Sequence, residues 1–107
     1  MTVPSIEELG MLHERICKAV GDPRRIQILY ALQARPHNVS DLAEELGIPQ
    51  PTASRHLTVL RQSSLVVAQR NGTSITYSLA DAGIIEVIDR MRRVLRDAVA
   101  RQPSLVA

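Results

Sequence analysis

The chain has 107 residues, of which 45% are apolar and 22% charged, a balance typical of one globular domain rather than of a disordered chain. Its single cysteine, Cys17, excludes an internal disulfide, and no apolar run approaches the ~20 residues that a membrane helix needs. The acidic start MTVPSIEEL lacks the basic and apolar segments of a secretion signal. We therefore expect one soluble, cytoplasmic domain over residues 1–107, with no contact to a membrane.

The net charge of +2 says little about partners, but the charges are unevenly distributed. No Asp or Glu lies between Leu46 and Ala80, whereas Arg55, Arg61 and Arg70 all fall in this window. An acid-free stretch flanked by acidic ones is typical of a surface that faces a polyanion. Chance clustering in a small protein explains the same pattern about as well.

Capping residues and helical periodicity predict two helices in the first third of the chain. Ser5 is placed to cap a helix over residues 5–20, whose apolar side chains recur at helical spacing: Ile6, Leu9, Leu12, Ile16 and Val20. Asp22 as N-cap and Pro23 at the first helical position begin the next helix, which ends before Pro36.

Two shorter helices are predicted next. The first covers about residues 39–46, with Asn38 or Ser40 as its cap and Gly47 as its terminator. The second begins at Pro51 and runs to about Ser63, and its inward stripe is expected to consist of Ala53, Leu57 and Leu60.

The periodicity then changes from helical to two. Residues 66–70 and 75–79 are rich in β-forming side chains, and Asn71-Gly72 between them predicts a tight hairpin turn, because both residues tolerate positive φ. Asp81 is placed to cap a last helix over residues 82–101. Its apolar residues recur with spacings of 4, 3, 4 and 3, which is typical of a coiled-coil seam: Ile84, Ile88, Met91, Leu95 and Ala98.

Four helices, a hairpin and a last helix form the layout of a winged helix-turn-helix, with the helix-turn-helix over 38–63 and the wing over 65–79. At this level the chain resembles the ArsR/SmtB family of small bacterial repressors over about residues 15–100. The matching segments are GDPRRIQIL at 21–29, VSDLA at 39–43, QPTASRHL at 50–57, Leu60, Leu65-Val66, RNG at 70–72 and YSL at 77–79.

The resemblance implies a mainly α fold with a two-stranded β-wing and a homodimeric repressor that binds an imperfect palindrome in double-stranded DNA. The first and last helices would form the dimer interface. Independently, the small core cannot cover both outer apolar stripes, and each Å² left wet costs ~25 cal/mol. The expected interface residues are Leu9, Leu12, Ile16, Ile84, Ile88, Met91 and Leu95. The alternative is that the last helix folds back over its own domain.

The helix over 51–63 is expected to carry the DNA contacts. Thr52, Arg55 and Thr58 face away from its apolar stripe, and Ser54 and His56 lie on the two flanks. Arg55 can bond guanine in bidentate fashion, and the resemblance supports Gln50, Ser54 and Arg55 as groove residues. A packing or phosphate-bonding role suits His56 better than base readout. The full expected set is Gln50, Thr52, Ser54, Arg55, His56, Thr58, Arg61 and, at the wing tip, Arg70, Asn71, Gly72 and Thr73.

The effector remains open, and we expect no resident metal or other cofactor. The resemblance implies two recurring metal sites, but residues 38–41 contain no thiol and the helix over 82–101 contains no histidine. His13 and Cys17, four residues apart on one helix face, could supply half of a zinc site, and Cys17 could be oxidised. A small buried cysteine beside a flanking histidine explains the pair more simply.

No phosphate-binding loop, zinc-protease motif or nucleophile with a nearby base occurs, so we do not expect an enzyme. The alternative function is a winged-helix module that binds an acidic protein instead of DNA. The sequence departs from the family pattern twice. Pro51 stands where a serine is common, and Ser63-Ser64 stands where a glycine usually ends the helix, which predicts a different or later helix end.

Overall fold

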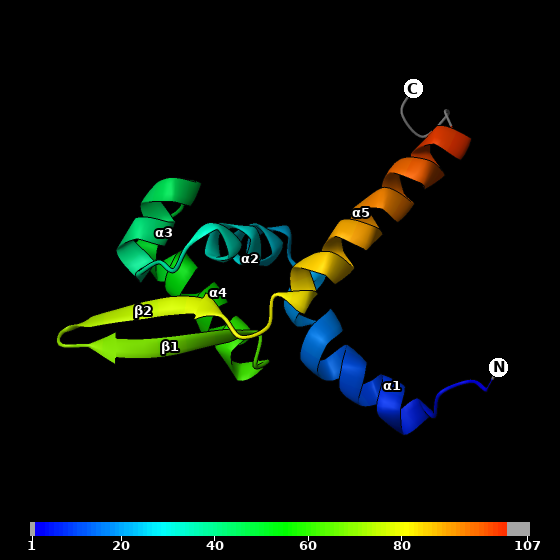
Figure 1. The fold of residues 1–107 in the computed structure, drawn as a ribbon, viewed down its shortest axis with the longest axis horizontal. Helices are drawn as coiled ribbons and strands as arrows, with labels where there is room; N and C mark the ends of the chain where they lie inside the picture. Colours follow the sequence, from blue (N-terminus) through cyan, green and yellow to red (C-terminus); the bar gives the residue numbers. More distant parts are fainter. Residues whose placement is uncertain (1, 103–107) are drawn as a thin grey trace.

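The computed structural model of the protein describes residues 2–102, and its elements follow the predicted order (Figure 1). The helices are α1 (Ile6–Leu12), η1 (His13–Cys17), η2 (Ala19–Gly21), α2 (Pro23–Ala34), α3 (Val39–Leu46), α4 (Gln50–Gln62) and α5 (Gly83–Arg101). The strands β1 (Val66–Asn71) and β2 (Ser74–Leu79) form one antiparallel pair. The mainly α fold with a two-stranded β-wing is therefore confirmed.

The first helical rod is less regular than its sequence predicts. Ser5 caps it as expected, since its hydroxyl oxygen accepts from the backbone N–H of Glu8 at 3.1 Å. The rod then changes from α to the π-helical turn η1, in which the N–H of Lys18 donates to the carbonyl of His13, before η2 ends it. At this irregular end the carbonyl of Lys18 accepts from the N–H of Gly21 at 3.2 Å, and the side chain of Arg25 donates to the carbonyls of both Lys18 and Ala19.

The predicted caps of α2 and α3 are present. The Asp22 carboxylate accepts from the N–H of Arg24 at 2.8 Å, with Pro23 at the first helical position. Of the two candidates for α3, Asn38 is the cap, because its side-chain oxygen accepts from the N–H of Asp41 at 2.8 Å. Gly47 ends α3 with a φ of 65°, a left-handed conformation that glycine adopts without a steric cost.

The end of α4 differs from what the lack of a glycine suggests. The helix stops after Gln62, and Ser64 takes the left-handed conformation with a φ of 63°. The N–H of Leu65 then donates to the carbonyl of Leu60 at 3.0 Å, which closes the helix end in the usual way. A serine therefore does at this turn what a glycine does at lower cost.

The hairpin turn lies one residue later than predicted. Asn71 pairs with Ser74, so the two loop residues are Gly72 and Thr73, and Asn71 remains in the strand. Only Gly72 has a positive φ, at 65°. The prediction of an Asn71-Gly72 loop was wrong because a glycine in the first loop position suffices for a two-residue turn.

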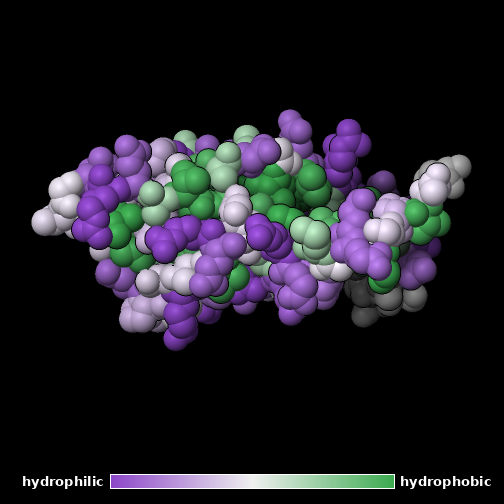
Figure 2. Space-filling view, turned by 90° about the horizontal axis from the view of Figure 1, so that it is seen from below, coloured by the Kyte–Doolittle hydropathy of each residue, from purple (hydrophilic) through white to green (hydrophobic). Residues whose placement is uncertain are grey.

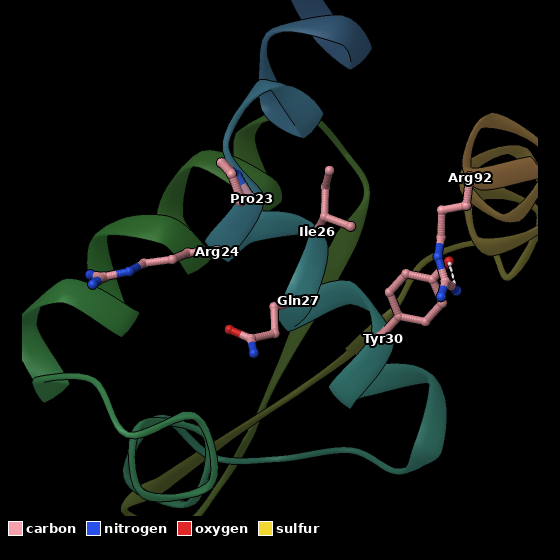
Figure 3. A pocket seen from close by; sticks show the side chains of 6 residues that line it. All are labelled: Pro23, Arg24, Ile26, Gln27, Tyr30 and Arg92. Carbon is pink, nitrogen blue, oxygen red and sulfur yellow. Dashed lines mark hydrogen bonds between the residues drawn. The ribbon is translucent and has the colours of Figure 1, made fainter. Parts of the chain in front are cut away.

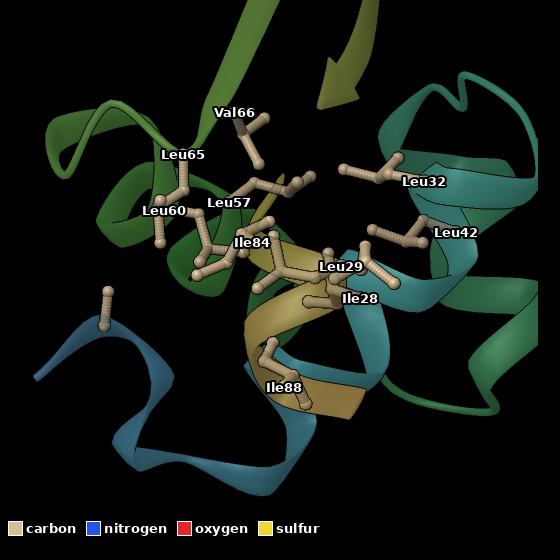
Figure 4. Close-up of a cluster of buried hydrophobic side chains, with 12 residues drawn as sticks. Ile28, Leu29, Leu32, Leu42, Leu57, Leu60, Leu65, Val66, Ile84 and Ile88 are labelled. Carbon is tan, nitrogen blue, oxygen red and sulfur yellow. The ribbon is translucent and has the colours of Figure 1, made fainter. Parts of the chain in front are cut away.

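One hydrophobic core joins the three central helices to the base of the wing and of α5. Figure 4 shows Ile28 and Leu29 of α2 beside Leu57 and Leu60 of α4, with Val66 at the start of β1 above them. The first turns of α5 close the core through Ile84, Ile85 and Ile88. The core thereby fixes α4 and the wing relative to each other.

A polar contact also fastens α5 to α2. The Tyr30 hydroxyl donates to the Asp89 carboxylate, and the Arg92 guanidinium donates to the same hydroxyl at 3.3 Å. That guanidinium lies over the Tyr30 ring, 5.4 Å from its centroid, next to a shallow cavity of about 700 Å³ (Figure 3).

Within residues 2–102, no helix is both long enough and apolar enough to span a bilayer.

Beyond this contact, the first helical rod (α1, η1 and η2, called the α1 rod below) and α5 diverge from the domain on the side opposite the wing tip (Figure 1). The residues expected at a dimer interface fall into two groups. Ile84 and Ile88 lie in the protomer's own core, and Ile16 is half-buried against it. The other four are exposed: Leu9, Leu12, Met91 and Leu95. Val87 and Val94 of α5 are exposed as well. Figure 2 shows hydrophobic side chains at the surface over the middle of the molecule.

Candidate nucleic-acid interface

The helix α4 presents a polar face opposite its buried stripe. Ala53, Leu57 and Leu60 face the core, as predicted. Of the expected contact residues on the other side, two are half-buried, Thr52 and His56. The others are exposed: Gln50, Ser54, Arg55, Thr58 and Arg61. The only side-chain partner of the Arg55 guanidinium among the described residues is the Thr52 hydroxyl at 3.4 Å, so its fork is free to bind a ligand.

The wing adds a second set of polar groups to this face. Arg70, Asn71, Gly72 and Thr73 are all exposed at its tip. A cavity of about 380 Å³ runs between the start of α3, α4 and the wing, and its polar lining includes Ser40, Ser54, Thr73 and Ser74. The structure therefore brings the predicted residues of α4 and of the turn to one surface, although they lie far apart in sequence.

The electrostatics of this surface follow from the sequence. No carboxylate occurs between Leu46 and Ala80, so Arg55, Arg61 and Arg70 have no acidic neighbour within that segment. The acids that come just before this segment in the sequence, Glu44 and Glu45, line a different cavity together with Arg35 and Asp41, and Asp22 lies near His56 at the edge of the face. Hydroxyls, amides and guanidinium groups without carboxylates are the donors that bind a phosphate backbone and base edges.

His56 lies at the edge of this face and contacts α2. Its Nδ1 atom is 3.4 Å from Nη1 of Arg25. Burial lowers the pKa of His56 below its ordinary value of 6.5, and the nearby guanidinium groups of Arg25, Arg24 and Arg55 lower it further, against the opposing effect of Asp22. The imidazole is therefore neutral near pH 7.

His37 has a partner that sequence inspection did not find. Its side chain is buried, Nδ1 donates to the carbonyl of Arg35 at 2.8 Å, and Nε2 lies 2.7 Å from Oε2 of Glu45. Its backbone also pairs with Tyr77 of β2. His37 thus ties the loop before α3 to both the end of α3 and the base of the wing.

The candidate effector residues His13 and Cys17 both lie exposed on η1, so the simpler prediction of a buried cysteine was wrong for the single chain. In the part of the chain that the structure describes, no group of three or more His, Cys, Asp or Glu side chains is arranged to hold a metal. The pair therefore stays a prediction, and a ligand set completed by a second chain is the form that it would take.

Sequence reasoning missed Arg25 as well as the partner of His37. The segment GDPRR indicated a helix start, and nothing in its spacing distinguished Arg25 from Arg24. Only the fold shows that the side chain of Arg25, which is 17% exposed, contacts the start of η2 and α4. Arg24 is exposed and extends away from Tyr30 and Arg92 (Figure 3).

A polar, acid-free helix beside a β-wing, both held by a three-helix core, defines a winged helix-turn-helix protein. The sequence profile described as "Bacterial regulatory protein, arsR family" matches residues 22–67. A relative, the HTH-type transcriptional regulator KmtR of Mycobacterium tuberculosis, is 36% identical over 84 residues, which are 78% of this chain and 59% of that protein. This chain therefore spans less than two thirds of that relative's length.

Solved structures agree with the sequence comparison. The crystal structure of M. tuberculosis Rv0081 superimposes with a TM-score of 0.76 and 32% identity over 88% of this chain and 95% of that one. Mb0332 from Mycobacterium bovis, described as a homodimeric winged helix-turn-helix DNA-binding domain, gives a TM-score of 0.74 and 28% identity over 95% and 96% of the two chains. This chain belongs to the ArsR family of bacterial regulatory proteins.

Proposed function

We propose that this protein is a sequence-specific DNA-binding transcriptional regulator that acts in the cytoplasm. In this proposal it is a homodimeric repressor that binds an imperfect palindrome through α4 and the wing of each protomer, and it has no enzymatic activity. The observation that carries the proposal is that Ser54 of α4 and Thr73 of the wing line one cavity, while Arg55 and Arg70 beside them are exposed with no acid in the segment between them. Family membership supports it.

In this proposal, Arg55 reads a base and Arg70 binds the backbone. Arg55 lies on the exposed side of α4, where a helix enters the major groove and a guanidinium can bond both O6 and N7 of guanine. Arg70 lies in β1 beside the turn, at the position from which a wing reaches phosphates or the minor groove. Gln50, whose oxygen accepts from the Ser40 hydroxyl at 3.3 Å, is held at the start of α4.

A second copy of the chain is the partner that the outer helices favour. Met91 is 52% exposed and Leu95 62%, a poor arrangement for a lone protomer in water. The α1 rod has a small excess of acids, with Glu7, Glu8 and Glu14 against Arg15 and Lys18. The outer part of α5 has a large excess of arginines, since only Asp97 opposes Arg90, Arg92, Arg93, Arg96 and Arg101. Apolar stripes and opposite charges on the two rods suit a twofold pairing.

Selection from a random-sequence duplex pool, followed by gel-shift titration, tests this function. We expect enrichment of a sequence with two half-sites about one helical turn apart. Absence of any enriched duplex would overturn the proposal, and it is the result that a module binding only proteins would give.

Two arginine variants then separate base readout from backbone binding. Arg55→Ala is expected to cost about 1–3 kcal/mol on the selected duplex and to relax preference at one position per half-site. Arg70→Ala is expected to weaken binding to selected and scrambled duplexes equally and to lower the salt slope by about 1. Equal losses from Arg55→Ala on both duplexes would contradict its base-reading role.

A further inference from the structure

The side chain of Arg25 joins three parts of the molecule that are separate in sequence. Nε donates to the carbonyl of Ala19 at 2.6 Å, and Nη2 donates to the carbonyl of Lys18 at 3.0 Å. The remaining nitrogen, Nη1, lies 3.4 Å from Nδ1 of His56 and 4.0 Å from a carboxylate oxygen of Asp22. One planar guanidinium thus links the end of the α1 rod to α4.

This contact determines which nitrogen of His56 carries the proton. A guanidinium can only donate, so the Nδ1 atom that faces Arg25 must be the accepting nitrogen. The proton of the neutral imidazole therefore lies on Nε2. Nε2 has no hydrogen-bond partner within residues 2–102, and no side-chain nitrogen or oxygen in that range is both buried and unpartnered. The Nε2–H group is therefore reachable from solvent.

We propose that Arg25 is a positioning residue that holds His56 with its Nε2–H directed to a backbone phosphate of bound DNA, and that it fixes α4 to the end of the α1 rod at the same time. The proposal rests on the proposed DNA-binding function and assigns a residue outside α4 and the wing to it. A phosphate contact at this edge carries no sequence information, so Arg25 would contribute to affinity and not to base preference.

The charges around His56 agree with this arrangement. The groups that face it are Asp22 and the guanidinium groups of Arg24 and Arg25 from α2 and its cap, and that of Arg55 from α4. Burial is the first cause of the lowered pKa of His56, and the three guanidinium groups lower it further, against Asp22, whose opposing effect is the largest of the four charges. A neutral imidazole whose Nδ1 is occupied can donate only through Nε2.

The tautomer is measured directly by long-range ¹H–¹⁵N spectra of the histidine rings in the free protein at pH 7.5, with His56→Ala for assignment. We expect Nε2 to be protonated and Nδ1 bare at His56 in the wild type, and a shift toward a mixture in Arg25→Lys, which keeps the charge but loses the fork. A protonated Nδ1 in the wild type overturns the proposal, whatever the DNA result.

Gel-shift titration on the selected duplex tests the phosphate contact. Arg25→Lys and His56→Ala are each expected to weaken binding about tenfold on selected and scrambled duplexes alike, and the double variant also about tenfold, because the two act through one contact. Arg24→Lys is the matched control, and its effect should add to that of His56→Ala. Additive losses for Arg25→Lys and His56→Ala would overturn the coupling.

His56→Gln tests whether position 56 must donate a hydrogen bond. His56→Gln, whose amide can donate from a similar place, should retain affinity within about threefold of the wild type. A Gln variant as weak as the Ala variant would refute a donor role, and this comparison needs no change at Arg25, should Arg25→Lys fail to fold. If the wild type binds no duplex, the DNA-binding function fails, while the tautomer spectrum still judges the Arg25–His56 contact.

Discussion

The helix-turn-helix with its wing and the pair of outer helices solve the burial of apolar surface in different ways. In the first region, α2, α3 and α4 and the base of β1 enclose their own apolar side chains, among them Leu29, Leu42 and Leu57. In the second, only the first turns of α5 are enclosed, and Val87, Met91, Val94 and Leu95 remain exposed.

The difference shows which part of the molecule buries its apolar side chains within a single protomer. The helix-turn-helix and the base of the wing are enclosed within one protomer, because their core is buried and the side chains of Asp22 and Asn38 cap α2 and α3. The outer helices are not enclosed, since their apolar residues recur at helical spacing and nothing else within residues 2–102 covers them. The proposed function requires this division, because each protomer would read one half-site and the outer helices would set the spacing.

The largest expected effect is that of Met91→Asp on the pairing of the outer helices. A carboxylate in the centre of the exposed stripe of α5 would have to be buried without a partner on pairing. We expect the dimer dissociation constant to rise about 100-fold or more, measured by sedimentation equilibrium, together with the loss of palindrome binding. Ala100→Asp, on the opposite side of the same helix, is the control. A Met91→Asp protein with unchanged mass in solution would refute the proposed interface.

His37→Ala tests how much the buried polar contacts around α3 stabilise the helix-turn-helix and wing. The change removes a buried side chain that bonds the carbonyl of Arg35 and the carboxylate of Glu45. We expect the free energy of unfolding to fall by about 1–3 kcal/mol in urea denaturation. His13→Ala, at an exposed position, should change it by less than about 0.5 kcal/mol. Similar losses for both variants would show that the His37 contacts contribute nothing.

Ser64→Gly should increase the stability of the same region. Ser64 has a φ of 63°, where a side chain is disfavoured and glycine is not. The substitution is expected to raise the free energy of unfolding by about 0.5–1 kcal/mol. Ser63→Gly, at a φ of −84°, provides the control and should be neutral or destabilising. Stabilisation by Ser63→Gly alone would contradict the assignment of the strained residue.

The smallest expected effect is a pH dependence at the junction of the two regions. The folded protein lowers the pKa of His56 below 6.5, chiefly through burial, so the unfolded chain binds a proton more readily. Stability should therefore fall as the pH drops below about 6.5. His56→Gln should have a shallower dependence of the urea midpoint on pH between 7.5 and 5 than the wild type. Identical slopes would show that His56 does not contribute.

Local signals in the sequence predicted most of the elements. Asp22-Pro23 and Gly47 indicated helix limits correctly, because caps and terminators act through neighbouring backbone groups. The same reasoning misplaced the hairpin turn by one residue and missed the left-handed Ser64. Both depend on the pairing and helix-end bonds that neighbouring elements form, and those are not visible in a short window of sequence.

The sequence by itself determined the order of helices and strands, the acid-free window and the polar face of α4, because these follow from periodicity, capping and the placement of charges along the chain. Three features became visible only in the folded chain. Ser54 of α4 and Thr73 of the wing line one cavity, and Arg25 contacts His56 as His37 contacts Glu45. Ile84 and Ile88 belong to the core, whereas Met91 is exposed. Such contacts join residues from different elements, so the packing of those elements sets them.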